Sequence, residues 1–237
     1  MTAVVVTDIA RADAATVDAL AVHGVATVHE AMGRTGLVGT WPAGIGLRPI
    51  QQDVRVAGTA VTVLSHPGDN LMIHAAVEQC RAGDLLVVTT TSPSTDGAFG
   101  ELFATALHAR GVRGLVTTTG VRDTAELRAL GFPVWATAVG AQGTVKATPG
   151  SVNVPVIIGG VVIHPGDVVI ADDDGIVCVP REDAASALSA SDARIAKEDA
   201  DRVAYRDGQL SLDRKGLRAS LTDLGVVYMT QQEYDAR

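Results

Sequence analysis

The middle of the chain alternates between segments with the pattern of buried strands and segments with the spacing of helices. Residues 84–90 and 114–119 are rich in Leu, Val and Thr, which is typical of strands. Residues 100–110 and 124–130 carry helical spacing, and 133–137 returns to a strand pattern. Because the connections are short, this order predicts a parallel sheet with right-handed crossovers.

The region before this core predicts two further helices and one strand. Residues 12–33 have apolar positions at helical spacing, and 37–50 are rich in Gly and Pro, as loops are. Residues 54–64 alternate as a strand does, and 70–80 return to helical spacing. We therefore expect helix, loop, strand and helix ahead of the strand at 84–90.

The last third of the chain changes character. Between residues 152 and 180, short apolar runs are separated by Pro and Gly, which predicts β-hairpins. Residues 181–206 predict a charged helix, and 213–224 a second short helical piece. The simplest organisation is an α/β domain at 1–180 and a C-terminal helical arm at 181–237 that belongs to the same unit.

Polar motifs in the two halves favour turns. His-Pro-Gly-Asp at 66–69 recurs at 164–167, and Pro-Gly is a frequent turn dipeptide. Residues 172–175, Asp-Asp-Asp-Gly, resemble a metal cluster but are more typical of a turn between hairpin strands. We interpret all three segments as turns.

Composition narrows the class of protein. Apolar residues make up 47% of the chain but aromatic residues only 3%, so the core is expected to consist of Val, Ile, Leu and Ala, as in α/β proteins. The net charge of −8 argues against nucleic acid as a partner. Cys80 and Cys178 form no CxxC pair and suit a reducing compartment. With no signal peptide or membrane span in the sequence, we expect a cytoplasmic protein without a membrane partner.

The loop before the helix at 100–110 is the first candidate for chemistry, because ligands of parallel sheets bind at the carboxyl ends of strands. At the start of this helix, the free N–H groups of Glu101, Leu102 and Phe103, together with the helix dipole, attract a carboxylate or phosphate. Glu101 can alternatively serve only to stabilise the helix dipole.

The loop after the next strand places Arg122 and Asp123 at the same end of the predicted sheet. Arginine grips a carboxylate with two parallel hydrogen bonds, and aspartate coordinates hard divalent cations. Together with the helix amides, these residues are suited to a 2-oxo acid. The alternatives are a solvated loop pair or a helix N-cap.

Other catalytic chemistries have less support. His74 on a mostly apolar helix is more typical of a core histidine. The sequence lacks the Gly-x-Ser-x-Gly elbow of many serine hydrolases. A Schiff-base aldolase needs a buried, neutral lysine, and Lys146 is the only candidate outside the C-terminal arm.

Several short motifs resemble the family of regulator of ribonuclease activity A, which also contains 4-hydroxy-4-methyl-2-oxoglutarate / 4-carboxy-4-hydroxy-2-oxoadipate aldolases. The shared motifs lie at 100–102, 110–112, 120–123, 132–134, 153–156, 165–167 and 171–179. Further motifs resemble the aldolase branch, at 27–34, 67–70, 143–148 and 150–153, as does the long C-terminal helix. The resemblance runs from about residue 12 to residue 228.

This resemblance implies an α/β sandwich of the swivelling-domain type, with central parallel strands, a β-hairpin region and a C-terminal helical arm. It also implies homotrimers or homohexamers with sites between subunits, and dependence on Mg2+ or Mn2+.

Position by position, the resemblance implies that Arg122 and the amides of Gly100, Glu101, Leu102 and Phe103 bind the pyruvoyl part of a substrate. Asp123 would ligate the metal, and Glu101 would hold a metal-bound water, although some relatives have Asp there. An acidic residue from a neighbouring subunit's C-terminal helix would complete the site. Glu198 matches best, with Asp199 next to it.

The implied reaction is retro-aldol cleavage to pyruvate plus a second pyruvate or oxaloacetate. Oxaloacetate decarboxylation is expected as a second activity, because it passes through the same pyruvate enolate. The alternative from another class is a non-enzymatic protein that binds a ribonuclease.

Overall fold

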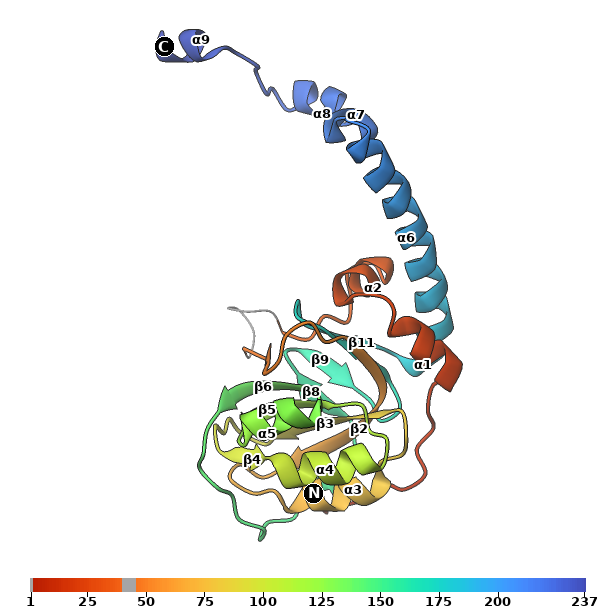
Figure 1. Ribbon diagram of the computed structural model, residues 1–237, viewed down its shortest axis with the longest axis vertical. Coiled ribbons are helices and arrows are strands. Elements are labelled where there is room, and N and C mark those ends of the chain that lie inside the picture. The colour runs from red at the N-terminus through yellow and green to blue at the C-terminus, as the bar shows by residue number, and fades with distance from the viewer. Residues whose placement is uncertain (1, 40–45) are drawn as a thin grey trace. The chain divides into compact units, whose positions relative to one another are not determined.

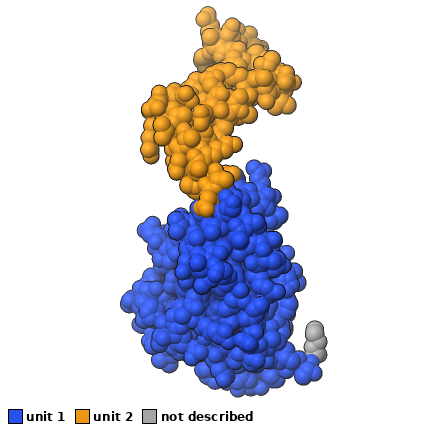
Figure 2. Space-filling model, turned by 90° about the vertical axis from the view of Figure 1, so that its right-hand side faces the viewer, with its two compact units in different colours: residues 1–191 blue, residues 192–237 orange. Residues whose placement is uncertain are grey.

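The computed structural model describes residues 2–39 and 46–237. The chain divides into two compact units, residues 1–191 and 192–237 (Figure 2). The division falls inside the long helix α6 (Ala184–Arg206). The domain boundary predicted at residue 180 stays a prediction.

The first unit is built on a mixed sheet whose centre is parallel, as the sequence predicts. Its four parallel strands are β2 (Val56–Ser65), β3 (Asp84–Thr90), β5 (Leu115–Val121) and β6 (Val134–Val139). They are joined by α3 (Leu71–Gln79), α4 (Glu101–Ala109) and α5 (Thr124–Leu130). Because β2, β3, β5 and β6 lie side by side in chain order, their carboxyl ends share one edge of the sheet.

Shorter strands extend this sheet on both sides. β1 (Arg48–Pro49) pairs with β6, and β4 (Gly97–Phe99) with β5. β7 (Ser151–Val152) pairs with β2, as does β10 (Val168–Ala171), which forms a hairpin with β11 (Ile176–Val179). A separate hairpin consists of β8 (Val156–Ile158) and β9 (Val161–Ile163).

Two layers cover the central strands (Figure 1). Helices α3, α4 and α5 pack on one face around residues such as Phe99, Leu107 and Phe132. The β8–β9 hairpin packs on the other face, where Trp135 and Ile163 are fully buried. Since both faces are covered, the parallel strands are buried along most of their length, and β2 is buried at nearly every position.

The helix predicted over 12–33 is wrong in one respect, because the structure has two helices there, α1 (Ala14–Leu20) and α2 (Val25–Ala31). The second helix begins after Gly24, where the N–H of Val25 donates to the carboxylate of Asp172 at 2.9 Å. Asp172 comes from the β10–β11 turn, so a distant residue caps the second helix. The spacing of apolar residues along 12–33 does not indicate that Asp172 caps a helix there.

Two segments without a strand pattern in the sequence contain short strands. Residues 91–99 are polar and read as a loop, but β4 at the end of this segment is buried and pairs with β5. The loop predicted over 37–50 contains β1 at its end, while 40–45 lie outside the described residues. Strands of two or three residues are too short to show a periodic pattern.

The two His-Pro-Gly-Asp segments are turns, as predicted, and each buries its aspartate. Gly68 and Gly166 have φ of 72° and 93°, which favours glycine. Asp69 and Asp167 are only 2% and 3% exposed. The Asp167 carboxylate accepts hydrogen bonds from the N–H groups of His164, at 2.8 Å, and Arg181, at 3.1 Å. Each turn is therefore hydrogen-bonded to a distant segment. Asp167 binds the amide of Arg181, and Asp69 binds the amide of Ala147.

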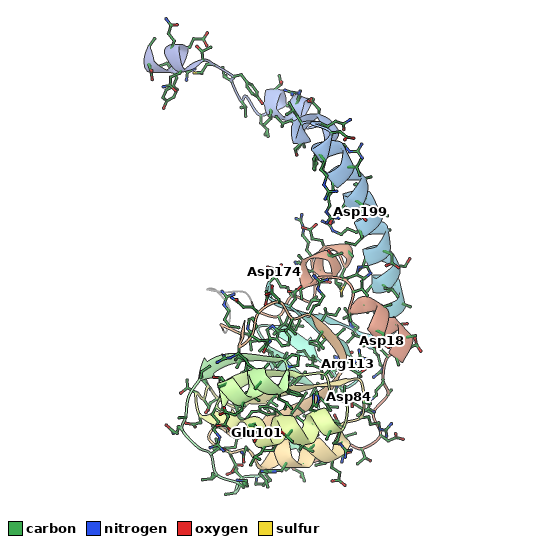
Figure 3. The ribbon with its side chains drawn as sticks, viewed as in Figure 1. Asp18, Asp84, Glu101, Arg113, Asp174 and Asp199 are labelled. Atoms are coloured by element: carbon green, nitrogen blue, oxygen red, sulfur yellow. The ribbon has the colours of Figure 1, made fainter. Side chains whose placement is uncertain are left out.

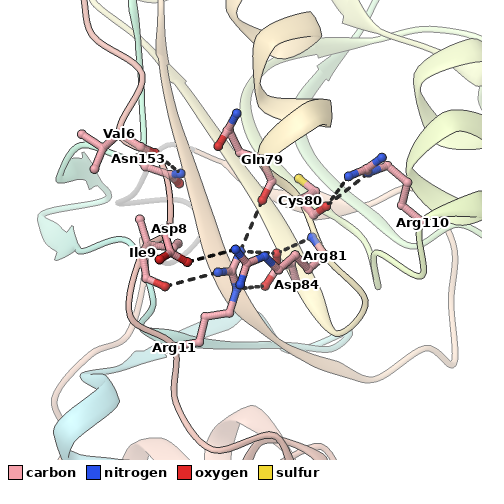
Figure 4. Close-up of polar contacts among 10 residues, drawn as sticks. All are labelled: Val6, Asp8, Ile9, Arg11, Gln79, Cys80, Arg81, Asp84, Arg110 and Asn153. Atoms are coloured by element: carbon pink, nitrogen blue, oxygen red, sulfur yellow. Dashed lines mark hydrogen bonds and ion pairs between the residues drawn. The ribbon is translucent and has the colours of Figure 1, made fainter.

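A buried ion pair fixes the N-terminal segment to the start of β3 (Figure 4). The guanidinium of Arg11 donates two hydrogen bonds to the Asp84 carboxylate, with N–O distances of 2.8 and 2.9 Å. Asp84, which is 1% exposed, also accepts the N–H of Arg81 at 2.7 Å. Removing one partner of such a pair typically costs about 3–5 kcal/mol, because the other charge stays buried alone.

The second unit contains the end of α6 and three short helices, α7 (Ser211–Arg214), α8 (Arg218–Asp223) and α9 (Gln231–Asp235). Within residues 192–237, all of which the structure describes, Ala204 is the only buried apolar residue. Leu224, Val227 and Tyr228 are each more than two-thirds exposed. This segment therefore has little buried apolar surface of its own to stabilise it.

Polar contacts hold the start of this unit together. Hydrogen bonds from Lys215 and Arg214 lower the pKa of Asp201 to about 2. None of the helices in the described part of the chain has the length and apolar character that a membrane crossing requires.

Candidate active site

A cavity of about 350 Å3 opens at the carboxyl ends of the parallel strands. The segments that follow all four strands contribute to its wall, namely Asn70 and His74 after β2, Gly100 and Phe103 after β3, Arg122 and Asp123 after β5, and Lys146 after β6. The two loops chosen from the sequence do meet here. The other two loops were not predicted to take part, although the same rule of strand ends applies to them.

Asp123 has an unusual backbone for a residue at the start of a helix. Its φ is 56°, in the left-handed region, and its side chain makes no capping hydrogen bond to α5. The carboxylate instead accepts the N–H of Glu101 through Oδ2, at 3.2 Å. Asp123 thus occupies the N-cap position of α5, as one alternative interpretation expected, but its side chain does not cap that helix. Its carboxylate is held at the start of the neighbouring helix α4, where the helix dipole favours negative charge.

Gly100 allows this close approach. A Cβ atom at this position would lie 2.3 Å from Oδ2 of Asp123 and 3.1 Å from Cγ of Arg122. Any side chain would therefore push both residues out of place, so glycine is required for the arrangement.

Arg122 lies beside Asp123 without closing a tight ion pair. Its Nε is 3.6 Å from Oδ2 of Asp123, and its side chain is 46% exposed. The backbone N–H of Arg122 donates to the carbonyl of Phe99 at 2.9 Å, which fixes the main chain. The guanidinium therefore keeps hydrogen-bond donors available for a ligand carboxylate.

The first turn of α4 supplies the predicted amides, with one difference. The N–H of Glu101 is already bonded to Asp123, whereas those of Leu102 and Phe103 have no acceptor within the described part of the chain. These two amides are available for an anion.

The Glu101 side chain does not line the cavity. It lies at the start of α4 (Figure 3), and its Oε1 accepts a hydrogen bond from the Thr105 hydroxyl at 2.7 Å. The predicted role of Glu101 in holding a water molecule stays a prediction.

The cavity is also lined by three polar residues that the sequence did not identify as substrate-binding residues, namely His74, Asn70 and Lys146. His74 was interpreted as a core histidine, but it is exposed and its ring packs on Phe103, with ring centroids 4.5 Å apart. Partial desolvation and the positive charge of Lys146 lower the pKa of His74 below its ordinary value. Asn70 is 9% exposed, and its side-chain amide donates to the carbonyl of Ala98 at 3.2 Å. Because that contact requires the nitrogen, the carboxamide oxygen points elsewhere, without a protein donor among the described residues.

The donor atoms at the cavity suit a divalent cation that is shared with a substrate. Of the described residues that line the cavity, only Asp123 is acidic, and its side chain is 40% exposed. The described part of the chain holds no cluster of three His, Cys, Asp or Glu residues that would form a complete metal site. Mg2+ commonly uses one or two carboxylates and keeps several waters, so Asp123 fits such an ion and a closed protein cage is not present among these residues.

Glu198 and Asp199, the candidates for an acidic residue from a neighbouring subunit, lie on the part of α6 that belongs to the second unit (Asp199 is labelled in Figure 3). Glu198 forms ion pairs with Arg194 at 2.9 Å and Arg202 at 3.1 Å. Asp199 pairs with Arg202 at 2.6 Å. Their participation in the site stays a prediction.

A second cleft, of about 570 Å3, opens on the hairpin side of the same strand ends. Its wall consists of hydroxyl-bearing residues from 89–95 together with Thr118, Thr137 and Ile157. The hydroxyls of Thr89 and Thr118 bond to each other at 2.9 Å. The described residues that line this cleft include no charged side chain.

Comparison with known proteins identifies the family. The profile of the RraA-like family, described as Aldolase/RraA, matches residues 25–178. The chain belongs to the RraA-like family. This confirms the resemblance seen in the sequence motifs, and the mixed α/β fold agrees with it.

Relatives within the RraA-like family carry different functional names. A protein of Halalkalibacterium halodurans named "Putative 4-hydroxy-4-methyl-2-oxoglutarate aldolase" is 28% identical over 166 residues, which are 70% of this chain and 79% of that protein. The crystal structure of Streptomyces coelicolor RraAS2, called an unusual member of the RNase ES inhibitor RraA protein family, has a TM-score of 0.71 and 28% identity. The match covers 81% of this chain and 99% of RraAS2.

A third relative is the RNA-processing inhibitor RraA from Thermus thermophilis. It matches with a TM-score of 0.53 and 28% identity, over 58% of this chain and 83% of its own. The names of these relatives therefore refer both to a putative aldolase and to inhibitors of a ribonuclease or of RNA processing.

Proposed function

We propose that this protein is a divalent-metal-dependent aldolase that cleaves 4-hydroxy-4-methyl-2-oxoglutarate or 4-carboxy-4-hydroxy-2-oxoadipate. The observation that carries the proposal is the meeting of Arg122, Asp123 and the first turn of α4 at one cavity. A guanidinium, two unused amides and a carboxylate are the groups needed to bind a 2-oxo acid together with a cation. The relative named as an aldolase supports the same reaction class.

Arg122 and the amides of Leu102 and Phe103 bind the C1 carboxylate of the substrate. Asp123 would hold the Mg2+ or Mn2+, which supplies positive charge against the negative charge that develops on the 2-oxo oxygen. Binding at both points orients the substrate so that the C3–C4 bond lies within the cavity.

Cleavage starts with loss of the proton from the 4-hydroxyl group. Glu101 and Glu198, the latter from a neighbouring subunit, accept this proton through a water molecule. The C4 oxygen then forms a carbonyl as the C3–C4 bond breaks, and the electron pair of that bond enters the pyruvate enolate. Arg122 stabilises the enolate charge, and protonation at C3 gives pyruvate. The other product is a second pyruvate or oxaloacetate.

A second activity follows from the same enolate. Oxaloacetate is a 2-oxo acid, and loss of CO2 from it leaves the pyruvate enolate in the same position. The departing carboxylate is already ionised, so no base is needed. We therefore propose oxaloacetate decarboxylation as a side activity of the same site.

The experiment is a coupled assay of pyruvate release over a panel of 2-oxo acids, with Mg2+ present. The proposal predicts release from the two named substrates and from oxaloacetate, and loss of all three in Arg122→Ala. Absence of pyruvate release from every 4-hydroxy-2-oxo acid in the panel would refute it.

A regulatory function is the second candidate, because one related structure is described as an RNA-processing inhibitor and another as an unusual member of the RNase ES inhibitor RraA protein family. It predicts that the protein slows cleavage of an RNA substrate by a ribonuclease of the RNase ES type. Arg122→Ala should leave this inhibition unchanged. Inhibition without aldolase activity would favour regulation over catalysis.

A further inference from the structure

Lys146 is a cation on the cavity wall that neither the proposed chemistry nor the family assignment uses. It is exposed and follows β6, on a loop that lines the cavity. Its ammonium group pairs with no carboxylate in the described part of the chain, whereas Lys215 pairs with Asp201. An exposed lysine does not suit the Schiff-base mechanism, which needs a buried, neutral amine.

The backbone on both sides of Lys146 is anchored by the turn after β2. The N–H of Asn70 donates to the carbonyl of Val145 at 3.0 Å. On the other side, the Asp69 carboxylate accepts the N–H groups of Ala147, at 2.8 Å, and Thr148, at 2.7 Å. Lys146 therefore projects from a loop that is fixed at both of its neighbours.

Asp69 is suited to this anchoring. Burial alone would raise the pKa of its carboxyl, but hydrogen bonds from the amides of Leu71, Ala147 and Thr148 outweigh burial and leave the pKa below its ordinary value. The carboxylate stays ionised at neutral pH and holds the Lys146 loop with charge-assisted hydrogen bonds.

The surroundings of Lys146 offer polar groups without a competing charge. His74 has a lowered pKa and is neutral at neutral pH, so it can share a hydrogen bond without repelling the ammonium. Asn70, nine-tenths buried on the same wall, has its carboxamide oxygen unpaired among the described residues. Within the described part of the chain, Lys146 is therefore a cation on the cavity wall that has uncharged polar neighbours and is available to an anion.

We propose that Lys146 binds the distal carboxylate of a 2-oxo diacid whose 2-oxo acid end is held by Arg122 and Asp123. This inference rests on the proposed function and adds the reason for diacid specificity. Two separate cations that line one cavity, Arg122 and Lys146, favour a substrate with two carboxylates, and both named substrates carry a carboxylate beyond C4. The protein's net charge of −8 makes such local cations necessary for a multiply charged anion to enter.

Two ligands that the enzyme cannot cleave allow binding at the two ends of the site to be measured separately. 2-Oxoglutarate has five carbons and a distal carboxylate, while 2-oxopentanoate has a methyl group in its place. We expect the wild-type protein with Mg2+ to bind 2-oxoglutarate more tightly, as measured by titration calorimetry. Lys146→Met should lower the affinity for 2-oxoglutarate by about fivefold, which is the size expected for the loss of a partly exposed ion pair. The affinity for 2-oxopentanoate should not change.

Two further variants control for structure and for overall charge. Lys146→Arg keeps the positive charge and should retain the preference for the diacid. Arg181→Met removes an exposed positive charge that does not line the cavity, and should change neither affinity.

The outcomes distinguish this inference from the proposed function. If Lys146→Met lowered the affinity for both ligands equally, or for neither, the role of Lys146 would be overturned. The proposed 2-oxo acid site would not be affected by that result. If the wild-type protein bound neither ligand, the proposed aldolase site and the role of Lys146 would both be refuted. Selective loss of 2-oxoglutarate binding would support both.

Discussion

The two clefts at the carboxyl ends of the parallel strands have similar positions but different charges. The cleft on the helix side is lined by Arg122, Asp123 and Lys146, whereas the one on the hairpin side is lined by hydroxyl and apolar groups. The uncharged cleft is the larger, at about 570 Å3 against about 350 Å3. Volume and location at strand ends therefore do not distinguish a site for an anionic substrate, but the presence of charged side chains does.

Strand alternation accounts for the uncharged cleft but not for the charged one. Side chains of successive strand residues point to opposite faces of the sheet. Val116 packs on the hairpin side, and Thr118, two residues later, lines the cleft on that side. Arg122 and Asp123 come after β5 has ended, so loop geometry and not strand alternation directs them to the helix side.

The largest expected effect is that of Asp123→Ala. It removes the carboxylate that would hold the metal, on which both proposed reactions depend, so each should fall by about 10³-fold or more. The measurement is the rate of aldol cleavage and of oxaloacetate decarboxylation, after subtracting decarboxylation by free metal. Retained enzymatic decarboxylation alongside lost aldolase activity would contradict a shared enolate.

Glu198→Ala should separate the two reactions. Aldol cleavage needs a base and should fall by about 10²-fold, while decarboxylation should fall much less because its leaving group is already ionised. Mixing Glu198→Ala with Arg122→Ala subunits should restore part of the activity if Glu198 serves a neighbour's site. No recovery despite demonstrated subunit exchange would place Glu198 outside that site.

Arg122→Lys tests how the charged cleft uses its arginine. Lysine keeps the charge but loses the planar two-point grip, so kcat should fall by about tenfold or more together with a rise in KM. A change confined to KM would mean that Arg122 positions the substrate and does not stabilise the enolate.

The smallest expected effect belongs to the uncharged cleft. Thr118→Val keeps the side-chain shape and removes the hydroxyl that bonds Thr89. It should lower stability by about 1 kcal/mol, seen as a small drop in Tm, and leave both catalytic rates within about twofold of wild type. A large loss of activity would mean that the comparison between the clefts assigns function to the wrong one.

Much of the fold could be predicted because its signals are local. The helix α5 and the strand β3 have the bounds expected from the sequence, since continuous apolar runs and short connections specify them. The break between α1 and α2 could not be predicted, because the Asp172 carboxylate that caps α2 comes from a turn far away in the sequence.

Some residues of the candidate site could likewise be predicted from the sequence, and others could not. Arg122 and Asp123 follow a recognisable strand, and the structure brings both to one cavity with the first turn of α4. Lys146 lies in an irregular loop whose path depends on the Asp69 carboxylate, so no periodic pattern shows that it faces the cavity. His74 was interpreted as a core residue because its helix is apolar, and only the packing shows its exposure.

The central claim, that the charged cleft is a metal-dependent site for 2-oxo diacids, is tested most directly by metal removal. The rate of pyruvate release from 4-hydroxy-4-methyl-2-oxoglutarate would be measured after treatment with EDTA, and again after addition of excess Mg2+ or Mn2+. Because Asp123 is the only protein carboxylate among the described residues that line the cavity, the ion should be held weakly and chelation should be complete. The account predicts loss of turnover with EDTA and its return with the added metal. Full activity in a preparation shown to be free of metal would contradict it.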